Sequence, residues 1–131
     1  MFLDASVIIA IIARESDAAA LAGRLRQANE VHISPIAIYE AVLGLARVGN
    51  TSILDAQIVL NRFLEESRAH IMPISAEVGC SAIAAFDRYG RGRHRAALNM
   101  GDCFAYACAR ALDVPILFKG EDFPLTDIAI A

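Results

Sequence analysis

The stretch Met1–Arg14 (MFLDASVIIAIIAR) joins a very short apolar segment to a longer one, with an aspartate and a serine between them. Phe2–Ala5 has the composition of a buried β-strand. Ser6 is a residue type that begins helices, so we expect a helix from there to about Arg14. A strand that passes directly into a helix is the repeating unit of α/β proteins. Asp4 is thereby predicted to lie at the carboxyl end of the first strand.

The rest of the chain alternates strand-like and helix-like segments in the same way. Short apolar stretches at 31–33, 70–74 and 114–118 are predicted strands, and 127–130 is a candidate edge strand. Helices are predicted at 16–28, 35–47, 52–68, 75–89 and 101–112. The alternation predicts an α/β fold with a mostly parallel sheet covered by helices on both faces. The length of 131 residues suits one domain, residues 1–131.

Composition excludes several classes of protein. The chain is 56% hydrophobic and 21% charged, which argues against disorder, and its net charge of −3 argues against coating nucleic acid through overall charge. The apolar run 7–13 is shorter than the roughly 18 residues that span a bilayer, and no basic residue precedes it as in a secretory signal. We therefore expect a cytoplasmic protein with no membrane partner. Cys80, Cys103 and Cys108 lack CxxC spacing and are predicted to be buried thiols.

Four of the fifteen acidic residues stand where solubility does not explain them: Asp4, Glu40, Asp102 and Asp122. Asp4 lies in an apolar stretch, where an unpaired ionised carboxylate costs several kcal/mol. Glu40 has apolar or glycine neighbours on its face of the predicted helix, and no basic residue there neutralises it. Asp122 follows the strand 114–118, so it shares with Asp4 the sheet edge at which α/β proteins bind ligands. Asp102 falls in the first turn of a helix, where the helix dipole favours an anion.

Two interpretations of these acids differ in their consequences. Asp4 and Asp102, each taken alone, need be no more than helix caps. All four together predict a cluster at one edge of the sheet. Converging carboxylates repel one another unless they share protons or bind a cation, and an all-oxygen site suits Mg²⁺ or Mn²⁺.

One basic segment, GRGRHR at 90–95, leads directly toward Asp102. Arg91, Arg93 and Arg95 are candidates for binding the phosphates of a nucleic acid. The alternative is a solvated loop, or an arginine that braces the acids. Lys119 beside the acidic edge is a further candidate for phosphate binding, with simple exposure as its alternative.

Four segments carry a resemblance to a known family: MFLDAS (1–6), IAIYEAVLGL (36–45), GRHRAALNMGDCFAYACA (92–109) and ILFKGEDFPLTDIA (116–129). In order and spacing they resemble the PIN-domain ribonucleases, specifically the VapC toxins of bacterial toxin–antitoxin pairs. The resemblance implies a single α/β/α sandwich with a mostly parallel sheet. It also implies a Mg²⁺-dependent endoribonuclease, with Mn²⁺ as a possible substitute, that hydrolyses RNA phosphodiester bonds.

The resemblance also assigns residues and partners. Asp4, Glu40 and Asp102 would be the core catalytic, metal-binding acids, with Asp122 as a fourth and more variable member. The implied partners are RNA, a cognate VapB-like antitoxin whose segment covers a groove of the toxin, and a second copy of the chain in a homodimer. The helices predicted at 52–68 and 75–85 have more apolar residues than one face requires. These residues belong either to the core or to an interface with a partner.

Two functions other than a nuclease make different demands on this sequence. A PIN-fold module that binds RNA or an antitoxin without turnover is one alternative, and the intact set of acids argues against it. A phosphoacceptor receiver domain also has an acidic edge and a lysine after a late strand. It needs an acceptor aspartate at the end of its middle strand, and the segment 70–75 has none.

Overall fold

The computed structural model describes all residues, 1–131. Its strands are β1 (Phe2–Leu3), β2 (His32–Ile33), β3 (His70–Ile71) and β4 (Ile116–Leu117), and they form one parallel sheet in the order β3-β2-β1-β4. The chain therefore extends the sheet from β1 to one side and then returns to add β4 on the other side. The strand order reverses next to β1, and α/β sheets bind ligands at the carboxyl ends of the strands at such a point.

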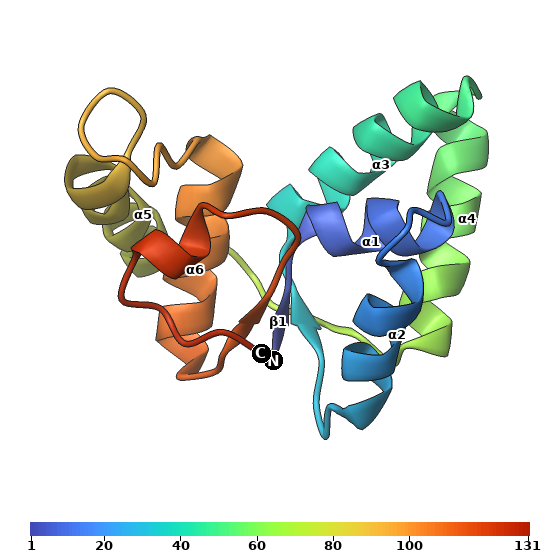
Figure 1. Ribbon diagram of the computed structural model, residues 1–131, viewed down its shortest axis with the longest axis horizontal. Helices are drawn as coiled ribbons and strands as arrows, with labels where there is room; N and C mark the ends of the chain where they lie inside the picture. Colours follow the sequence, from blue (N-terminus) through green and yellow to red (C-terminus); the bar gives the residue numbers. More distant parts are fainter.

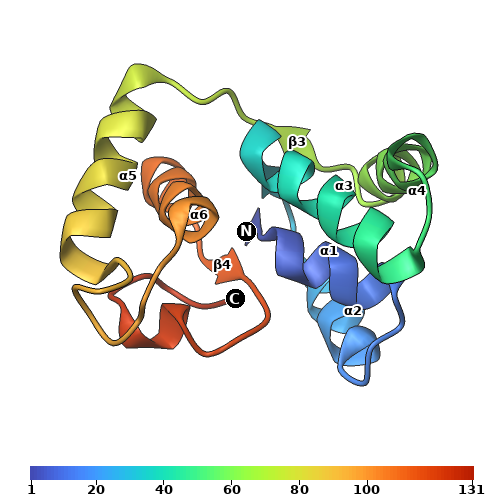
Figure 2. The ribbon, with the colours of Figure 1, turned by 90° about the horizontal axis from the view of Figure 1, so that it is seen from above.

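Helices cover both faces of this sheet, which confirms the predicted α/β sandwich (Figure 1). One layer contains α1 (Ala5–Ile12), α2 (Ala18–Gln27), α3 (Pro35–Gly49) and α4 (Ile53–Glu66). The other contains α5 (Ala76–Tyr89) and α6 (Met100–Leu112), with the short 3-10 helix η1 (Phe123–Leu125) nearby. The two chain ends lie near each other on either side of β4 (Figures 1 and 2). No helix is long and apolar enough to cross a membrane.

The core is divided by the sheet into two clusters. Successive strand residues point to opposite faces, so Leu3 and Leu117 join the cluster under α1–α4, whereas Phe2 and Ile116 join the cluster under α5 and α6. All four of these side chains are fully buried. Burial on both faces explains why the strands consist of apolar residues without polar alternation.

Several predicted boundaries differ from the structure. Each strand pairs over only two residues, because helices or loops follow at once; Asp4, directly after β1, is already the N-cap of α1. The prediction that Ser6 caps this helix was therefore wrong, because the N-cap lies two residues earlier. The candidate edge strand 127–130 is a single parallel bridge between Ile116 and Ile130 rather than a strand. Of the cysteines, Cys80 is exposed, contrary to prediction, because it lies on the outer side of α5.

Candidate metal centre

Asp4 is held at the carboxyl end of β1 by the start of α1. Its Oδ2 accepts hydrogen bonds from the backbone N–H of Ser6, at 2.9 Å, and from the Ser6 hydroxyl. The residue is only 7% exposed, and burial raises its pKa although the Ser6 hydrogen bonds oppose the rise. Asp4 is thus both a helix cap and a buried acid, and the cap alone does not account for its burial.

Glu40 reaches the same place from α3. That helix begins at Ser34, whose buried hydroxyl accepts a hydrogen bond from the Ala37 N–H at 3.2 Å. One turn after Glu40, Gly44 touches α1 so closely that a Cβ there would lie 2.2 Å from Ile9 Cδ1. This close packing of α3 on α1 brings Glu40 toward Asp4. Burial, and then the charges of Asp4 and Asp102, raise the pKa of Glu40 to about 7.

Asp102 enters the cluster from the first turn of α6. It forms a capping box with Asn99: the Asn99 side chain accepts from the Asp102 N–H at 3.0 Å, and Asp102 Oδ2 accepts from the Asn99 N–H at 2.8 Å. Burial first, and then the charges of Asp4 and Asp122, raise its pKa to about 6, while the Asn99 hydrogen bond and Arg91 oppose the rise. Like Asp4, Asp102 caps a helix, but capping does not explain why its pKa is raised. Burial and the neighbouring acids explain the rise.

Gly101 is a site residue that the sequence analysis missed. A Cβ at this position would lie 2.1 Å from Glu40 Oε1 and 2.2 Å from its Oε2. Only glycine therefore lets the carboxylate of Glu40 lie directly against the start of α6. The available signal was a glycine immediately before an aspartate at a helix start, which sequence alone does not connect to a residue on another helix.

Asp122 completes the set from the loop after β4. It directly precedes η1 and is exposed, and its charge contributes to the raised pKa of Asp102. The four predicted acids are thus brought together. The charges of Asp4 and Asp102 raise the pKa of Glu40, and the charges of Asp4 and Asp122 raise the pKa of Asp102. Their meeting point is the predicted carboxyl edge of the sheet, next to the reversal of strand order.

The donor chemistry of this cluster fits a hard divalent cation. Every donor is a carboxylate oxygen, and the nearby thiol of Cys103 has its pKa raised to about 11 by burial and by Asp102, so it stays protonated at neutral pH. No group of three or more acidic, histidine or cysteine side chains is already arranged around one ion. Mg²⁺ does not require such a shell, because it keeps several waters and binds through one or two carboxylates.

The predicted phosphate-binding residues divide into two kinds. Arg91, in the loop before α6, is close enough for its charge to lower the pKa of Asp102, and Arg95 in the same loop is exposed. Arg93 instead pairs with Asp87 at 2.8 Å. The ammonium of Lys119 is engaged by Glu15 and Asp17.

The backbone of Lys119 has a role that sequence reasoning did not foresee. Its N–H donates to the Ser6 hydroxyl oxygen at 2.9 Å, while that hydroxyl donates to Asp4. Ser6 thereby fastens the loop after β4, which carries Asp122, to the acid at the end of β1. Asp127 is engaged elsewhere, accepting hydrogen bonds from Tyr106 at 2.6 Å and from Arg88 at 3.0 Å.

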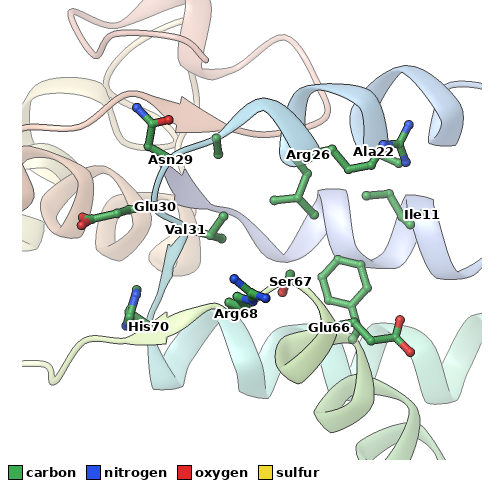
Figure 3. Close-up of a pocket in the computed structure, with 13 residues that line it drawn as sticks. Ile11, Ala22, Arg26, Asn29, Glu30, Val31, Glu66, Ser67, Arg68 and His70 are labelled. Atoms are coloured by element: carbon green, nitrogen blue, oxygen red, sulfur yellow. The ribbon is translucent and has the colours of Figure 1, made fainter.

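The pocket drawn in Figure 3, of about 570 Å³, has none of these acids in its lining. It lies between α1, α2 and α4, next to the segments that precede β2 and β3, and so at the amino edge of the sheet. Ile11, Leu25 and Phe63 supply apolar surface. Charged residues accompany them: Arg26, Glu30, Glu66 and Arg68.

Comparison with known proteins agrees with this geometry. The PIN domain family model matches residues 1–129. "Ribonuclease VapC" of Mycolicibacterium smegmatis is 36% identical over 130 residues that cover 98% of both chains. "VapC ribonuclease R02377" of Rhizobium meliloti is 35% identical over 139 aligned residues, covering 97% of this chain and 98% of that one.

Solved structures show the same fold. The crystal structure of VapC20 of Mycobacterium tuberculosis, described as a sarcin-ricin loop cleaving toxin, has a TM-score of 0.79 at 14% identity, covering 99% of this chain and 97% of that one. A toxin–antitoxin complex from Klebsiella pneumoniae has a TM-score of 0.71 at 17% identity, covering 99% and 95%. The family is decided by the similarities in sequence rather than by those in structure: the chain belongs to the PIN-domain family, among the VapC ribonucleases.

Proposed function

We propose that this VapC-family ribonuclease is a single-domain, Mg²⁺-dependent endoribonuclease and the toxin of a toxin–antitoxin pair, with Asp4, Glu40, Asp102 and Asp122 as its metal-binding acids. One observation carries the assignment. Burial first, and then the charges of neighbouring carboxylates, raise the pKa values of the half-buried Glu40 and Asp102 to about 7 and about 6, and Arg91 opposes this rise only at Asp102. A divalent cation removes that repulsion, and clusters of perturbed acids mark functional sites.

A bound divalent ion would supply Lewis-acid activation of the phosphodiester and of an attacking water. The protein's own contribution is to hold the oxygen ligands in fixed positions. Ser6 orients Asp4 and the capping box orients Asp102, while Gly101 leaves room for Glu40. Asp122 is exposed, so it can also orient the attacking water. Hydrolysis would form a bond between the water oxygen and phosphorus, with loss of a proton from that water, and break the bond between phosphorus and the leaving ribose oxygen, which takes up a proton.

RNA binding by an acidic protein follows from where the charges lie. Without the four site acids the chain would carry +1 rather than −3. We propose that Arg91 and Arg95 contact RNA phosphates, with Arg93 contributing once its ion pair with Asp87 opens. Lys119 remains a weaker candidate, because two carboxylates already hold its ammonium.

The proposed antitoxin site is the pocket between α1, α2 and α4 (Figure 3). A toxin–antitoxin complex is among the proteins with this fold, which supports an antitoxin partner. An amphipathic helix fits the pocket, because apolar residues can contact Phe63 while charged ones pair with Arg26 and Arg68. Changing Phe63 to Ala is expected to weaken binding of the antitoxin and to spare cleavage of RNA by the free toxin.

The proposed homodimer uses the apolar surface between α5 and α6. A pocket of about 240 Å³ there is lined only by hydrophobic side chains. Ile83 is 72% exposed and Met100 63% exposed, although both are large and apolar. Exposed apolar patches of this kind mark interfaces. Sedimentation of the wild type and of Ile83→Asp tests this proposal. A wild-type protein that sediments as a monomer contradicts it. We also propose that the protein acts in the cytoplasm.

The decisive experiment measures cleavage of a structured RNA with Mg²⁺ and with EDTA. We expect Asp102→Asn and Glu40→Gln to lose activity by a factor of about 100 or more, as when a charged catalytic group is removed. The matched controls are Asp113→Asn and Glu65→Gln, which change exposed acids outside the site. Wild-type protein that binds RNA and never cuts it with Mg²⁺ or Mn²⁺ contradicts the proposal and supports a binding module.

A further inference from the structure

The segment 119–127 follows β4 and carries Asp122, the exposed member of the acid cluster. Its beginning is fastened to the layer of α1, because the Lys119 N–H donates to the Ser6 hydroxyl oxygen at 2.9 Å. Its end carries Asp127, an acid that takes no part in the cluster. Asp122 therefore lies between two points at which the segment is attached to the rest of the molecule.

Asp127 is bound by the opposite layer of helices. Its Oδ1 accepts a hydrogen bond from the hydroxyl of Tyr106 on α6 at 2.6 Å, and its Oδ2 accepts from the guanidinium of Arg88 on α5 at 3.0 Å. Tyr106 is only 7% exposed and lies about one helical turn after Asp102. The bond between Tyr106 and Asp127 thus ties the end of the segment to the helix that carries Asp102.

The charge states of this pair favour a strong bond. The Tyr106 hydrogen bond holds the pKa of Asp127 below its usual range, with further support from the charge of Arg88. Burial, and then the bond to Asp127, raise the pKa of Tyr106 to about 12. At neutral pH the phenol therefore keeps its proton and donates it to an ionised carboxylate, and hydrogen bonds of this charge-assisted kind are stronger than neutral ones.

The stretch from Asp122 to Asp127 is closed on itself by short hydrogen bonds. The Leu125 N–H donates to the carbonyl oxygen of Asp122 at 3.2 Å. The backbone N–H and the hydroxyl of Thr126 both donate to the carbonyl oxygen of Phe123, at 2.9 Å and 2.7 Å. Phe123 itself is buried in the core under α5 and α6. The position of Asp127 is therefore passed on to Asp122 through a turn that has little freedom.

We propose that Asp127 is a positioning residue of the acid cluster: by binding Tyr106 and Arg88, it sets where Asp122 lies relative to Asp102. The inference rests on the proposed ribonuclease function and adds to it a residue that contacts neither metal nor RNA. Residues that hold metal ligands in place typically change metal affinity or activity by about 10-fold to 100-fold when they are removed.

Two variants test this role through different atoms. Asp127→Asn keeps the size of the side chain but has one acceptor oxygen, so it cannot accept from both Tyr106 and Arg88. Tyr106→Phe removes only the hydroxyl and leaves the ring in the core. We expect each change to raise the Mg²⁺ concentration for half-maximal RNA cleavage about 10-fold or more. Because both remove the same bond, the double variant should show less than the product of the two single effects.

The matched control is Asp55→Asn. The Asp55 carboxylate also accepts two side-chain hydrogen bonds, from Ser52 at 2.7 Å and from Thr51 at 3.3 Å, but it lies at the start of α4 outside the cluster. Its Mg²⁺ requirement should equal that of the wild type. Urea unfolding of every variant separates positioning from stability, since a merely structural role would lower the free energy of unfolding and leave the Mg²⁺ requirement of the folded protein unchanged.

The outcomes distinguish this inference from the proposed function. If the wild type cleaves RNA with Mg²⁺ and both variants keep the wild-type Mg²⁺ requirement, the positioning role is overturned and the ribonuclease function stands. If the wild type shows no Mg²⁺-dependent cleavage, the proposed function is overturned and this inference with it. A raised requirement in both variants, absent from Asp55→Asn, supports the role of Asp127.

Discussion

At the scale of single residues, the acid cluster depends on side chains that have no charge of their own. Gly101 is the clearest case, because its missing Cβ is what admits the carboxylate of Glu40. Ser6 is another, since its hydroxyl joins Asp4 to the loop after β4. Such residues determine where the proposed metal ligands lie, and their removal is expected to disturb the site without removing any of these ligands.

Gly101→Ala is expected to lower Mg²⁺ affinity and RNA cleavage about 10-fold to 100-fold, the range seen when a ligand's support is lost. The new Cβ would displace the Glu40 carboxylate. The matched control is Gly79→Ala on α5, where a Cβ meets nothing within 4 Å. That change should keep full activity and stabilise the helix by up to about 1 kcal/mol. Wild-type Mg²⁺ affinity in Gly101→Ala would contradict this role.

Glu40→Gln is expected to stabilise the metal-free protein at pH 8 while abolishing cleavage. The folded pKa of Glu40, about 7, is above its ordinary value of 4.5, so its stabilising effect is present below pH 4.5 and is lost as pH rises through 7. Discounted for partial exposure, the gain is about 1 kcal/mol. Urea unfolding in EDTA at pH 8 and pH 4.5 measures it. Equal stability of variant and wild type at pH 8 contradicts the expectation.

At the scale of elements, the site is assembled from one strand end, two helices and two loops. β1 delivers Asp4, α3 delivers Glu40, and the first turn of α6 delivers Asp102. The loop at 90–98 connects α5 to α6 and carries the arginines, so RNA bound there, as proposed, would lie next to Asp102. This arrangement predicts that the arginines differ in importance according to their distance from the acids and their ion pairs.

Arg91→Ala is expected to weaken RNA binding more than Arg93→Ala, because Arg93 is already neutralised by Asp87. The salt dependence of the binding constant should become shallower by about 0.7 for each lost phosphate contact with single-stranded RNA. Fluorescence anisotropy in the Asp4→Asn background measures binding without cleavage. Arg62→Ala on α4, which removes an exposed pair with Glu66, is the control. An unchanged salt dependence in Arg91→Ala would exclude the contact.

At the scale of the whole molecule, the sheet separates two layers with different tasks. The layer of α5 and α6 supplies Asp102 and the basic loop, and the layer of α1–α4 supplies Glu40 and the larger pocket (Figure 1). The acids sit where the layers meet, at the carboxyl edge of the sheet. Binding of a metal at the proposed site would link the two layers, so the stability of the entire fold is expected to respond to it.

Mg²⁺ is expected to raise the unfolding temperature at pH 8, by an amount that corresponds to about 2.7 kcal/mol when its concentration is 100 times the Kd. At pH 5 the gain should be small, because Glu40 and Asp102, with pKa values of about 7 and about 6, then hold protons that compete with the metal. Differential scanning calorimetry checks both conditions. Asp4→Asn should show little gain at either pH, and a full gain in that variant would place the metal elsewhere.

The order of the elements and the candidate acids can be predicted from the sequence alone, because local patterns of residues encode them. Alternating apolar segments and helix-start residues predicted the order of strands and helices. The isolated acids at Asp4, Glu40, Asp102 and Asp122 stood out because their neighbours are apolar or offer no cation. Boundaries were less predictable: Asp4 and Ser6 are both good caps, and only the backbone path after β1 decides between them.

Tertiary structure alone decided which distant residues meet. The contacts of Gly101 with Glu40, of Lys119 with Glu15 and Asp17, and of His32 with His70 join residues far apart in the sequence. They depend on the strand order β3-β2-β1-β4 and on the close packing of α1 against α3, which no local propensity encodes. Sequence therefore determined the elements and the candidate acids, and the packing of those elements determined the site, because side chains interact across space rather than along the chain.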